Sequence, residues 1–328
     1  MHAAVQSQRG RRLHGTLAPM NSCGFDFQAM SSACEIRLDG DDTPARQAAA
    51  HQAIAEVRRI EQTYSRYRSD SIVSRINAAA GSGVPVRVDT ETAALLAFAA
   101  QLHALSDGLF DITSGVLRRV WDFRAARLPD PNALRGLLPL IGWSLVEWND
   151  RAIALPRVGM EIDFGGFGKE YAADRAMAVL AAAGQRHGYV NLGGDIRVLG
   201  PRADGSAWQF GIQHPRNTDA TIASVAMTEG ALASSGDYER FFDLDGRRYC
   251  HILDPHSGWP VIGWASVSVT APACVAAGAL STIAMLKGEA ALAFLSTQRA
   301  TFLAVDSRLH IHQHEQAHSG PFALGDTP

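Results

Sequence analysis

The segment EIDFGGFGKEYAADRAMAVLAAAGQRHGYVNLGGDIRVLG, residues 161–200, indicates the class of fold. Its first apolar run ends in glycines, and the alanine-rich segment 169–183 predicts a helix that Gly184 is placed to end. The run 188–200 reads as short strand segments around the glycine pair 193–194. Strands and a helix therefore alternate here around glycine turns.

The rest of the chain continues this mixture with helices at uneven intervals. A helix is predicted from Thr43 to about Ser69, because Thr43-Pro44 supplies an N-cap and a first-turn proline and apolar residues recur every three or four positions. A second helix is predicted over 90–106, with a buried stripe of Leu95, Phe98, Leu102 and Leu105. Other predicted elements are strands at 25–38, 144–150, 152–166, 208–215, 224–236 and 265–271, helices at 274–286 and after Gly288, and a closing hairpin at 300–312. Because the regular βαβα rhythm of a doubly wound sheet is missing, we predict an α+β fold with mixed sheets and packed helices.

Composition narrows the class of protein. The chain has 328 residues, 47% of them apolar and 19% charged, which predicts a globular protein. We expect a disordered tail at 1–19 followed by one domain, 20–328, made of two closely associated lobes. The net charge of −3 provides no basic field for nucleic acid.

The sequence also predicts a location. The first nineteen residues contain arginines but no following apolar run of the kind a secretion signal needs, and no apolar stretch is judged long or charge-free enough to span a bilayer. The four cysteines show no metal-binding spacing and are expected to be reduced, partly buried thiols. We therefore expect a cytoplasmic protein without a membrane partner.

Three glycine turns, 163–169, 191–195 and 234–238, each follow a predicted strand. The first opens the predicted helix, whose N-terminal amides and Lys169 could hold a phosphate. This arrangement suits a nucleotide. The alternative is that the glycines only form tight turns.

Two further segments contain groups suited to catalysis. In RYCHILDPHSGWP, residues 248–260, His251 could accept a proton from a hydroxyl near neutral pH, and Asp254 follows three residues later. A single histidine can equally be structural. In the predicted helix at 274–286, Gly278 and Thr282 share one face, which by itself indicates only helix packing.

Seven sequence blocks, taken together and in this order, resemble the ApbE family of FAD:protein FMN transferases from about Phe27 to Val305. They are AMSS at 29–32, YRSDS at 67–71 with Asn77, GLFDIT at 108–113 with WDF at 121–123, DFGGFGKEYAAD at 163–174, NLGGDI at 191–196, SSGDY at 234–238 and HILDPHSGWP at 251–260. The last is similar to the family pattern H-I-x-D-P-x-T-G-x-P. The resemblance implies an ApbE-like, T-fold-like architecture.

The resemblance also implies a reaction. Family members bind FAD and a divalent metal, normally Mg²⁺, and transfer FMN to a threonine of a partner flavoprotein, releasing AMP. By the same resemblance His251 would be the catalytic base with Asp254 beside it, and the metal ligands would be Thr282 and the carbonyl of Gly168. The FAD site would contain Met30, Tyr67, Asp111, Lys169, Asn191, Gly193, Gly194, Ser235 and Gly236.

One departure from the family pattern concerns the metal. Gly278 stands where the family motif A-D-x-L-x-T has an aspartate ligand, and Glu170 stands where the family usually has glycine. We hypothesise that Glu170 replaces the lost carboxylate. The alternative is an ordinary first-turn glutamate favoured by the helix dipole.

Other functions stay open at this point. The same chemistry with water as acceptor would make the protein an FAD pyrophosphatase, and loss of the metal would leave a non-catalytic FAD-binding protein. His310, His312 and His314 alternate near the C-terminus and could bind a transition metal, but an exposed hairpin also explains them.

Overall fold

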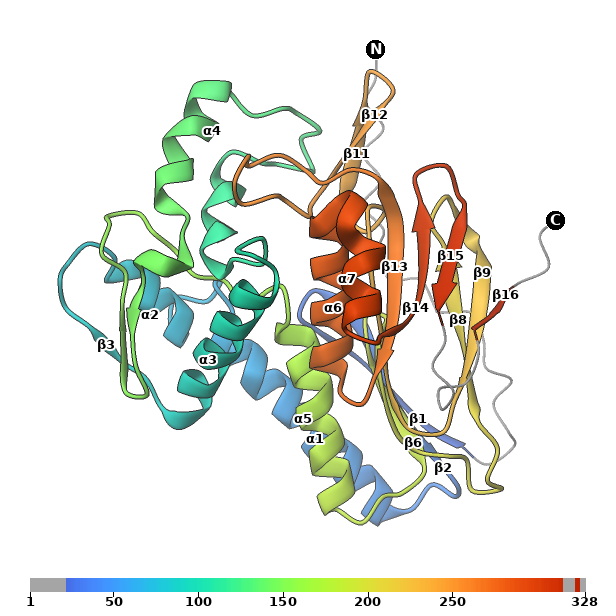
Figure 1. Ribbon diagram of the computed structural model, residues 1–328. Coiled ribbons are helices and arrows are strands. Elements are labelled where there is room, and N and C mark those ends of the chain that lie inside the picture. Colours follow the sequence, from blue (N-terminus) through green and yellow to red (C-terminus); the bar gives the residue numbers. More distant parts are fainter. Residues whose placement is uncertain (1–21, 315–321, 325–328) are drawn as a thin grey trace.

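An eight-stranded antiparallel sheet is the largest element of the computed structural model, which describes residues 22–314 and 322–324 (Figure 1). The strand order is β1-β2-β6-β7-β10-β13-β14-β15. Their bounds are β1 Ser22–Ala29, β2 Ser32–Asp39, β6 Gly188–Leu192, β7 Asp195–Gly200, β10 Gly230–Gly236, β13 Trp264–Ala271, β14 Thr301–Asp306 and β15 Ile311–His314. The tail predicted at 1–19 lies outside the described residues.

Helices cover one face of this sheet, as Figure 1 shows. They are α1 Pro44–Tyr64, α5 Gly168–Ala182, α6 Cys274–Lys287 and α7 Ala291–Thr297, with a 3-10 turn, η4 Gly288–Ala290, between the last two. α6 packs against β10 and β13, and α5 packs against α1 and β7. Helix α1 begins as predicted, since the Thr43 hydroxyl accepts a hydrogen bond from the Arg46 amide at 3.2 Å.

A smaller sheet covers the opposite face. It has the order β16-β9-β8, formed by β8 Trp208–His214, β9 Asn217–Met227 and β16 Phe322–Leu324. The two faces follow from alternation along each strand: on β6, Val190 and Leu192 belong to the core beneath the helices, whereas Tyr189 belongs to the core beneath the small sheet.

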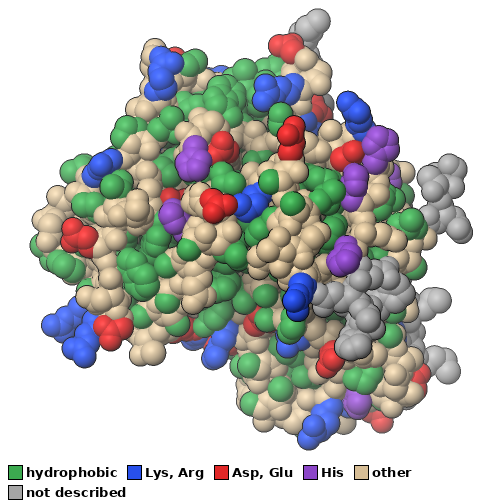
Figure 2. All heavy atoms as spheres, viewed as in Figure 1, with side chains coloured by type: hydrophobic (Ala, Val, Ile, Leu, Met, Phe, Trp, Pro, Cys, Tyr) green, Lys and Arg blue, Asp and Glu red, His purple; other side chains and the backbone are tan. Residues whose placement is uncertain are grey.

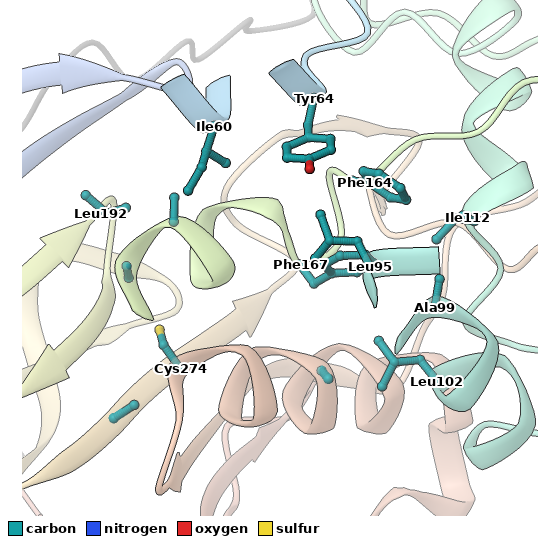
Figure 3. Close-up of a cluster of buried hydrophobic side chains, with 14 of the residues drawn as sticks. Ile60, Tyr64, Leu95, Ala99, Leu102, Ile112, Phe164, Phe167, Leu192 and Cys274 are labelled. Carbon is teal, nitrogen blue, oxygen red and sulfur yellow. The ribbon is translucent and has the colours of Figure 1, made fainter. Parts of the chain in front are cut away.

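Most of the remaining elements are helical and lie to one side of the large sheet in Figure 1. They are α2 Ile72–Ala78, α3 Thr90–Leu105, α4 Pro131–Leu137, the 3-10 helices η1 Ile112–Arg119, η2 Leu138–Leu140 and η3 Trp143–Leu145, and a sheet of β3 Val86–Arg87, β5 Ala152–Ala154 and β4 Glu147–Trp148. Figure 3 shows Leu95 and Ala99 of α3 beside Phe167 and Tyr64, in the same apolar cluster as Leu192 of β6. The side elements and the sheet thus share a continuous core.

A third apolar cluster supports the loop between β12 and β13. The hairpin of β11 Phe241–Leu244 and β12 Arg247–Cys250 contributes Phe242 and Tyr249, which pack with Trp121. The indole nitrogen of Trp121 donates a hydrogen bond to the carbonyl of Gly258 at 2.8 Å. This contact ties the HILDPHSGWP loop, residues 251–260, to the cluster.

The α+β class is confirmed, but several local predictions are wrong. Residues 25–38 form a hairpin instead of one strand, because Met30 and Ser31 adopt positive φ angles of 50° and 60°. The run predicted as a strand at 152–166 is a strand only to Ala154, and the run at 224–236 is divided between β9 and β10. Leu105 is 38% exposed, so it does not belong to the buried stripe of α3.

The expectations that the chain has no membrane-spanning stretch and no basic field can also be compared with the structure. By length and composition alone, the helical stretch Cys274–Thr297 is apolar enough to cross a membrane, so the expectation that no such stretch exists is wrong. Half of the apolar 18-residue window within that stretch is buried in the protein, and α6 packs against the sheet. On the face drawn in Figure 2, acidic and basic side chains are interspersed.

Candidate functional site

The first turn of α5 contains the groups that the sequence analysis expects to bind a phosphate. Phe167 occupies the N-cap position and supplies no side-chain acceptor, so the positive end of the helix dipole is not capped by a side chain. Lys169 follows, with its ammonium 2.7 Å from Asp195 Oδ2 at the start of β7. Although burial favours the neutral amine, the carboxylates of Asp195 and Glu170 raise the pKa of Lys169 above its usual value.

The β6–β7 turn brings a second segment to the same place. Asn191 Oδ1 accepts a hydrogen bond from the Gly194 amide at 2.9 Å, which closes the turn. Gly193 has a φ of +64°, and a Cβ there would lie 2.8 Å from the side chain of Ser32 and 3.7 Å from Lys169 Nζ. Only glycine fits between these groups, so the β1–β2 turn, the β6–β7 turn and α5 converge on Lys169.

Glu170 turns away from solvent toward α6. Its side chain is buried, with Oε2 lacking a hydrogen-bond partner within the described residues. A Cβ on Gly278 would lie 2.4 Å from Glu170 Oε1 and 2.6 Å from Cγ. Burial, reinforced by the negative charge of Asp195, raises the pKa of Glu170.

Hydroxyl groups join β10 to α6 next to this point. Ser235 Oγ lies 2.8 Å from Ser281 Oγ and 2.9 Å from Thr282 Oγ1. Ser281 in turn donates to the carbonyl of Gly278 at 3.0 Å. The predicted residues Ser235 and Thr282 are therefore in contact, one helical turn from Gly278.

His251 lies at the end of β12. Its backbone amide donates to the Arg240 carbonyl at 2.9 Å, while Nδ1 of the ring is buried without a partner in the described part of the chain. Burial, together with the positive charges of Arg240 and Lys169, lowers the pKa of His251 to about 4. The imidazole is thus neutral at pH 7, with a pKa well below the ordinary value assumed from the sequence.

The structure does not pair Asp254 with His251. Asp254 Oδ1 accepts from the His256 amide at 2.9 Å and Oδ2 accepts from the Ser257 hydroxyl at 2.8 Å, so the carboxylate builds its own turn. Its backbone amide donates to the Trp259 carbonyl at 2.9 Å. These contacts shape the loop that follows His251.

Other predicted residues lie around the cluster. Asp111 is buried and accepts hydrogen bonds from Thr113 and from the Trp143 amide, which anchors η1 and η3. Tyr67 is 75% exposed and accepts from Arg66 at 2.9 Å. The Met30 amide donates to Glu61 Oε1 at 2.7 Å. Among the described residues, no hydrogen bond or ion pair joins Asp111 or Tyr67 to Lys169.

Two residues of the cluster were given no role by the sequence analysis. Asp195 carries the ion pair with Lys169, and the signal for it was an acidic residue directly after a Gly-Gly turn. Asp174 accepts hydrogen bonds from the amides of Cys274 and Val275 at 2.9 Å each, which caps α6 from α5. This cap fixes α6, and hence Gly278, relative to α5.

The C-terminal histidines are part of a surface hairpin. His310 Nδ1 lies 3.0 Å from Asp306 Oδ2, and His312 packs edge-on against Trp264. Across residues 22–314 and 322–324, no group of three His, Cys, Asp or Glu side chains is placed to hold a metal ion. All four cysteines fall within these residues and are free, buried thiols, as predicted except for the degree of burial.

Comparison with known proteins places this cluster in a family. The model of the ApbE family matches residues 30–304, which include every segment of the cluster. The chain belongs to the ApbE family. Among curated ApbE relatives, the FAD:protein FMN transferase of Treponema pallidum is 32% identical over 282 residues, covering 79% of this chain and 77% of the relative. That of Haemophilus influenzae is 29% identical over 266 residues, covering 77% and 76%.

Solved ApbE structures share the fold. A crystal structure of an ApbE protein from Thermotoga maritima superposes with a TM-score of 0.83 at 30% identity, covering 90% of this chain and 97% of that one. The flavin transferase ApbE of Vibrio cholerae gives a TM-score of 0.80 at 24% identity, covering 91% and 98%. The ApbE-like fold predicted from the seven sequence blocks is therefore confirmed.

Proposed function

We propose that this protein is an FAD:protein FMN transferase that uses Mg²⁺ and transfers FMN to a threonine of a partner flavoprotein in the cytoplasm. The names of its relatives support the transferase activity. The observation that carries the proposal in this chain is the convergence of the α5 N-terminus, Lys169 and the β6–β7 glycine turn at one point. Such a place suits an anionic pyrophosphate.

The proposed reaction is attack of a threonine hydroxyl on the FAD phosphorus nearer the riboflavin. A new P–O bond to threonine forms, the pyrophosphate P–O bond breaks, and AMP leaves with that bridging oxygen. Lys169 and the first amides of α5 would stabilise the negative charge on the phosphates. Neutral His251 would accept the proton of the hydroxyl.

The residues present fit a hard divalent cation. Glu170 Oε2 is a buried carboxylate oxygen with no hydrogen-bond partner in the part of the chain that the structure describes, and the Thr282 hydroxyl lies one turn from Gly278, against which Glu170 packs. We propose that Glu170, Thr282 and the Gly168 carbonyl would hold Mg²⁺. When bound, the ion would add positive charge at the pyrophosphate.

The test of this function is release of AMP. The purified protein, FAD and Mg²⁺ are incubated with and without a flavoprotein carrying a target threonine, and AMP is measured together with covalent flavin on the acceptor. We expect AMP release to depend on the acceptor. AMP without acceptor would instead indicate an FAD pyrophosphatase, and tight FAD binding without AMP would indicate a non-catalytic binder.

A variant of Lys169 tests the phosphate site separately from turnover. Lys169→Met keeps an apolar stem of similar length but removes the ammonium, and we expect the Kd for FAD to rise roughly 10–100-fold, about 1.4–3 kcal/mol, since charged hydrogen bonds have this size. The Kd for ADP should rise in parallel, while that for riboflavin should not change. Titration calorimetry with the three ligands measures this, and a riboflavin affinity that falls as much as that of ADP would place Lys169 at the flavin ring.

A further inference from the structure

Glu170 and Gly278 belong to different helices but share one volume. A Cβ on Gly278 would lie 2.4 Å from Glu170 Oε1, 2.6 Å from Cγ and 2.8 Å from Cδ. Real Cβ atoms do not approach heavy atoms this closely, and the atoms in the way are those of a buried side chain packed between α5 and α6. The structure therefore has room for a side chain at only one of the two positions.

The side chain that fills this volume is an acid that remains unsatisfied. Glu170 is 7% exposed, and its Oε2 has no hydrogen-bond partner within the described residues. Leaving a buried carboxylate oxygen unpaired costs free energy comparable to losing a charged hydrogen bond. If Glu170 served only to fill space or to favour the helix dipole, an apolar residue or an exposed acid would avoid that cost.

Other groups around the carboxylate do not remove the need for a partner. Lys169 is next to it in sequence, but its ammonium pairs with Asp195 at 2.7 Å. The hydroxyls of Ser281 and Thr282 are engaged with Ser235. What is missing at Oε2 is a positive charge or a donor, and a small divalent cation with oxygen ligands would supply it.

We infer that Glu170 and Gly278 are a complementary pair, in which α5 rather than α6 delivers the one carboxylate that binds a divalent cation, and residue 278 remains glycine to admit it. The inference rests on the proposed function in one respect only: that the cation bound here is the one that acts in the reaction with FAD. Moving the carboxylate from α5 to α6 therefore requires that residues 170 and 278 be changed together.

The experiment measures Mn²⁺ binding, as a spectroscopic substitute for Mg²⁺, by the loss of the free Mn²⁺ electron paramagnetic resonance signal. It uses the full chain without nucleotide, because ADP binds Mn²⁺ by itself and would also remove the free signal. We expect one bound Mn²⁺ per chain, and Glu170→Gln, which keeps the shape of the side chain, should raise the Kd roughly 10–100-fold or more. Glu56→Gln is the matched control, because Glu56 pairs with Arg59 and Arg175 on the outer side of α1 and α5, and its Kd should stay unchanged.

Exchange variants test the shared volume. Gly278→Asp alone should lower the Tm, because its Cβ has no space beside Glu170, and should not tighten Mn²⁺ binding. Glu170→Gly alone should lose Mn²⁺ binding. The double variant Glu170→Gly with Gly278→Asp should bind Mn²⁺ with a Kd at least tenfold lower than that of Glu170→Gly. Equal Mn²⁺ affinity of the wild type and Glu170→Gln, or a double variant no better than Glu170→Gly, would overturn the inference.

The outcomes also separate this inference from the proposed function. A wild-type protein that binds Mn²⁺ through Glu170 but releases no AMP from FAD would support the exchanged ligand and contradict the transferase. A wild-type protein that releases AMP from FAD, together with a Glu170→Gln variant of unchanged Mn²⁺ affinity, would support the transferase and contradict the exchanged ligand.

Discussion

Replacing His251 with alanine is expected to lower the turnover of FAD about 10²–10⁴-fold, the usual contribution of a positioned general base. The expected Kd for FAD is nearly unchanged, because Lys169 and the α5 amides provide the charge complement to the phosphates. The reason lies in the ring itself: among the described residues Nδ1 is buried without a partner, and burial lowers the pKa of His251 to about 4, so the base is already neutral at pH 7. Single-turnover AMP release and FAD titration measure the two quantities.

The His251→Asn variant is the control for packing, since it keeps a polar side chain without a titratable ring. Normal turnover in His251→Ala would rule out the base assignment. Loss of folding in His251→Ala, with normal turnover in a folded His251→Asn, would give His251 a structural role only.

The lowered pKa of His251 also predicts how the free energy of unfolding depends on pH. Because the folded-state pKa is below the ordinary 6.5, the unfolded chain binds a proton first as the pH falls, so ΔG of unfolding decreases between pH 6.5 and about 4. The stabilisation that comes from neutral, buried His251 is fully present above pH 6.5. Urea unfolding of the wild type and His251→Asn across this window should show a shallower pH dependence in the variant.

The sequence predicted the elements whose signals are local. Thr43-Pro44 at the start of α1 and Gly184, with a φ of +78°, after α5 depend only on neighbouring residues, and the helices begin and end within a residue or two of the predicted positions there. The end of α1 was predicted later, at Ser69, because the sequence does not show that Ser65 already leaves helical geometry. The β1–β2 hairpin was missed because Met30 and Ser31 adopt positive φ angles, which residues other than glycine seldom do and which the sequence therefore did not indicate.

The candidate site was predictable as a set of residues but not as a set of contacts. Lys169, Asn191, Gly193, Ser235 and Thr282 were identified from motifs and lie in the convergent segments. The partners of each group come from distant segments and cannot be read from spacing. The volume shared by Glu170 and Gly278, and the turn that engages Asp254, became visible only with the helices and loop in place.

The second large effect is expected at Trp121, whose replacement by alanine should reduce the free energy of unfolding by about 3–5 kcal/mol, the usual cost of removing a large aromatic side chain from a core. Trp121 is 4% exposed and packs edge-on against Trp259 at 5.4 Å and stacked on Phe123 at 5.6 Å between ring centroids. Phe242 and Tyr249 also pack on Trp121, so its removal opens a cavity where the aromatic side chains of this cluster meet. Urea unfolding monitored by far-UV circular dichroism measures the change.

Trp121→Phe separates packing from the hydrogen bond to the loop. Phenylalanine retains most of the apolar contacts but leaves the Gly258 carbonyl without its indole donor, and we expect a loss of about 1–3 kcal/mol. Gly258 has a φ of +73°, and a Cβ there would lie 2.7 Å from Leu134, 3.2 Å from Leu138 and 3.3 Å from Leu117, so the loop packs closely on this cluster. Because the same loop begins at His251, Trp121→Phe should also lower turnover more than it lowers FAD affinity. A Trp121→Ala protein that loses less than about 1 kcal/mol would show that the cluster adds little to the core, and unchanged turnover in Trp121→Phe would show that the indole does not position the loop.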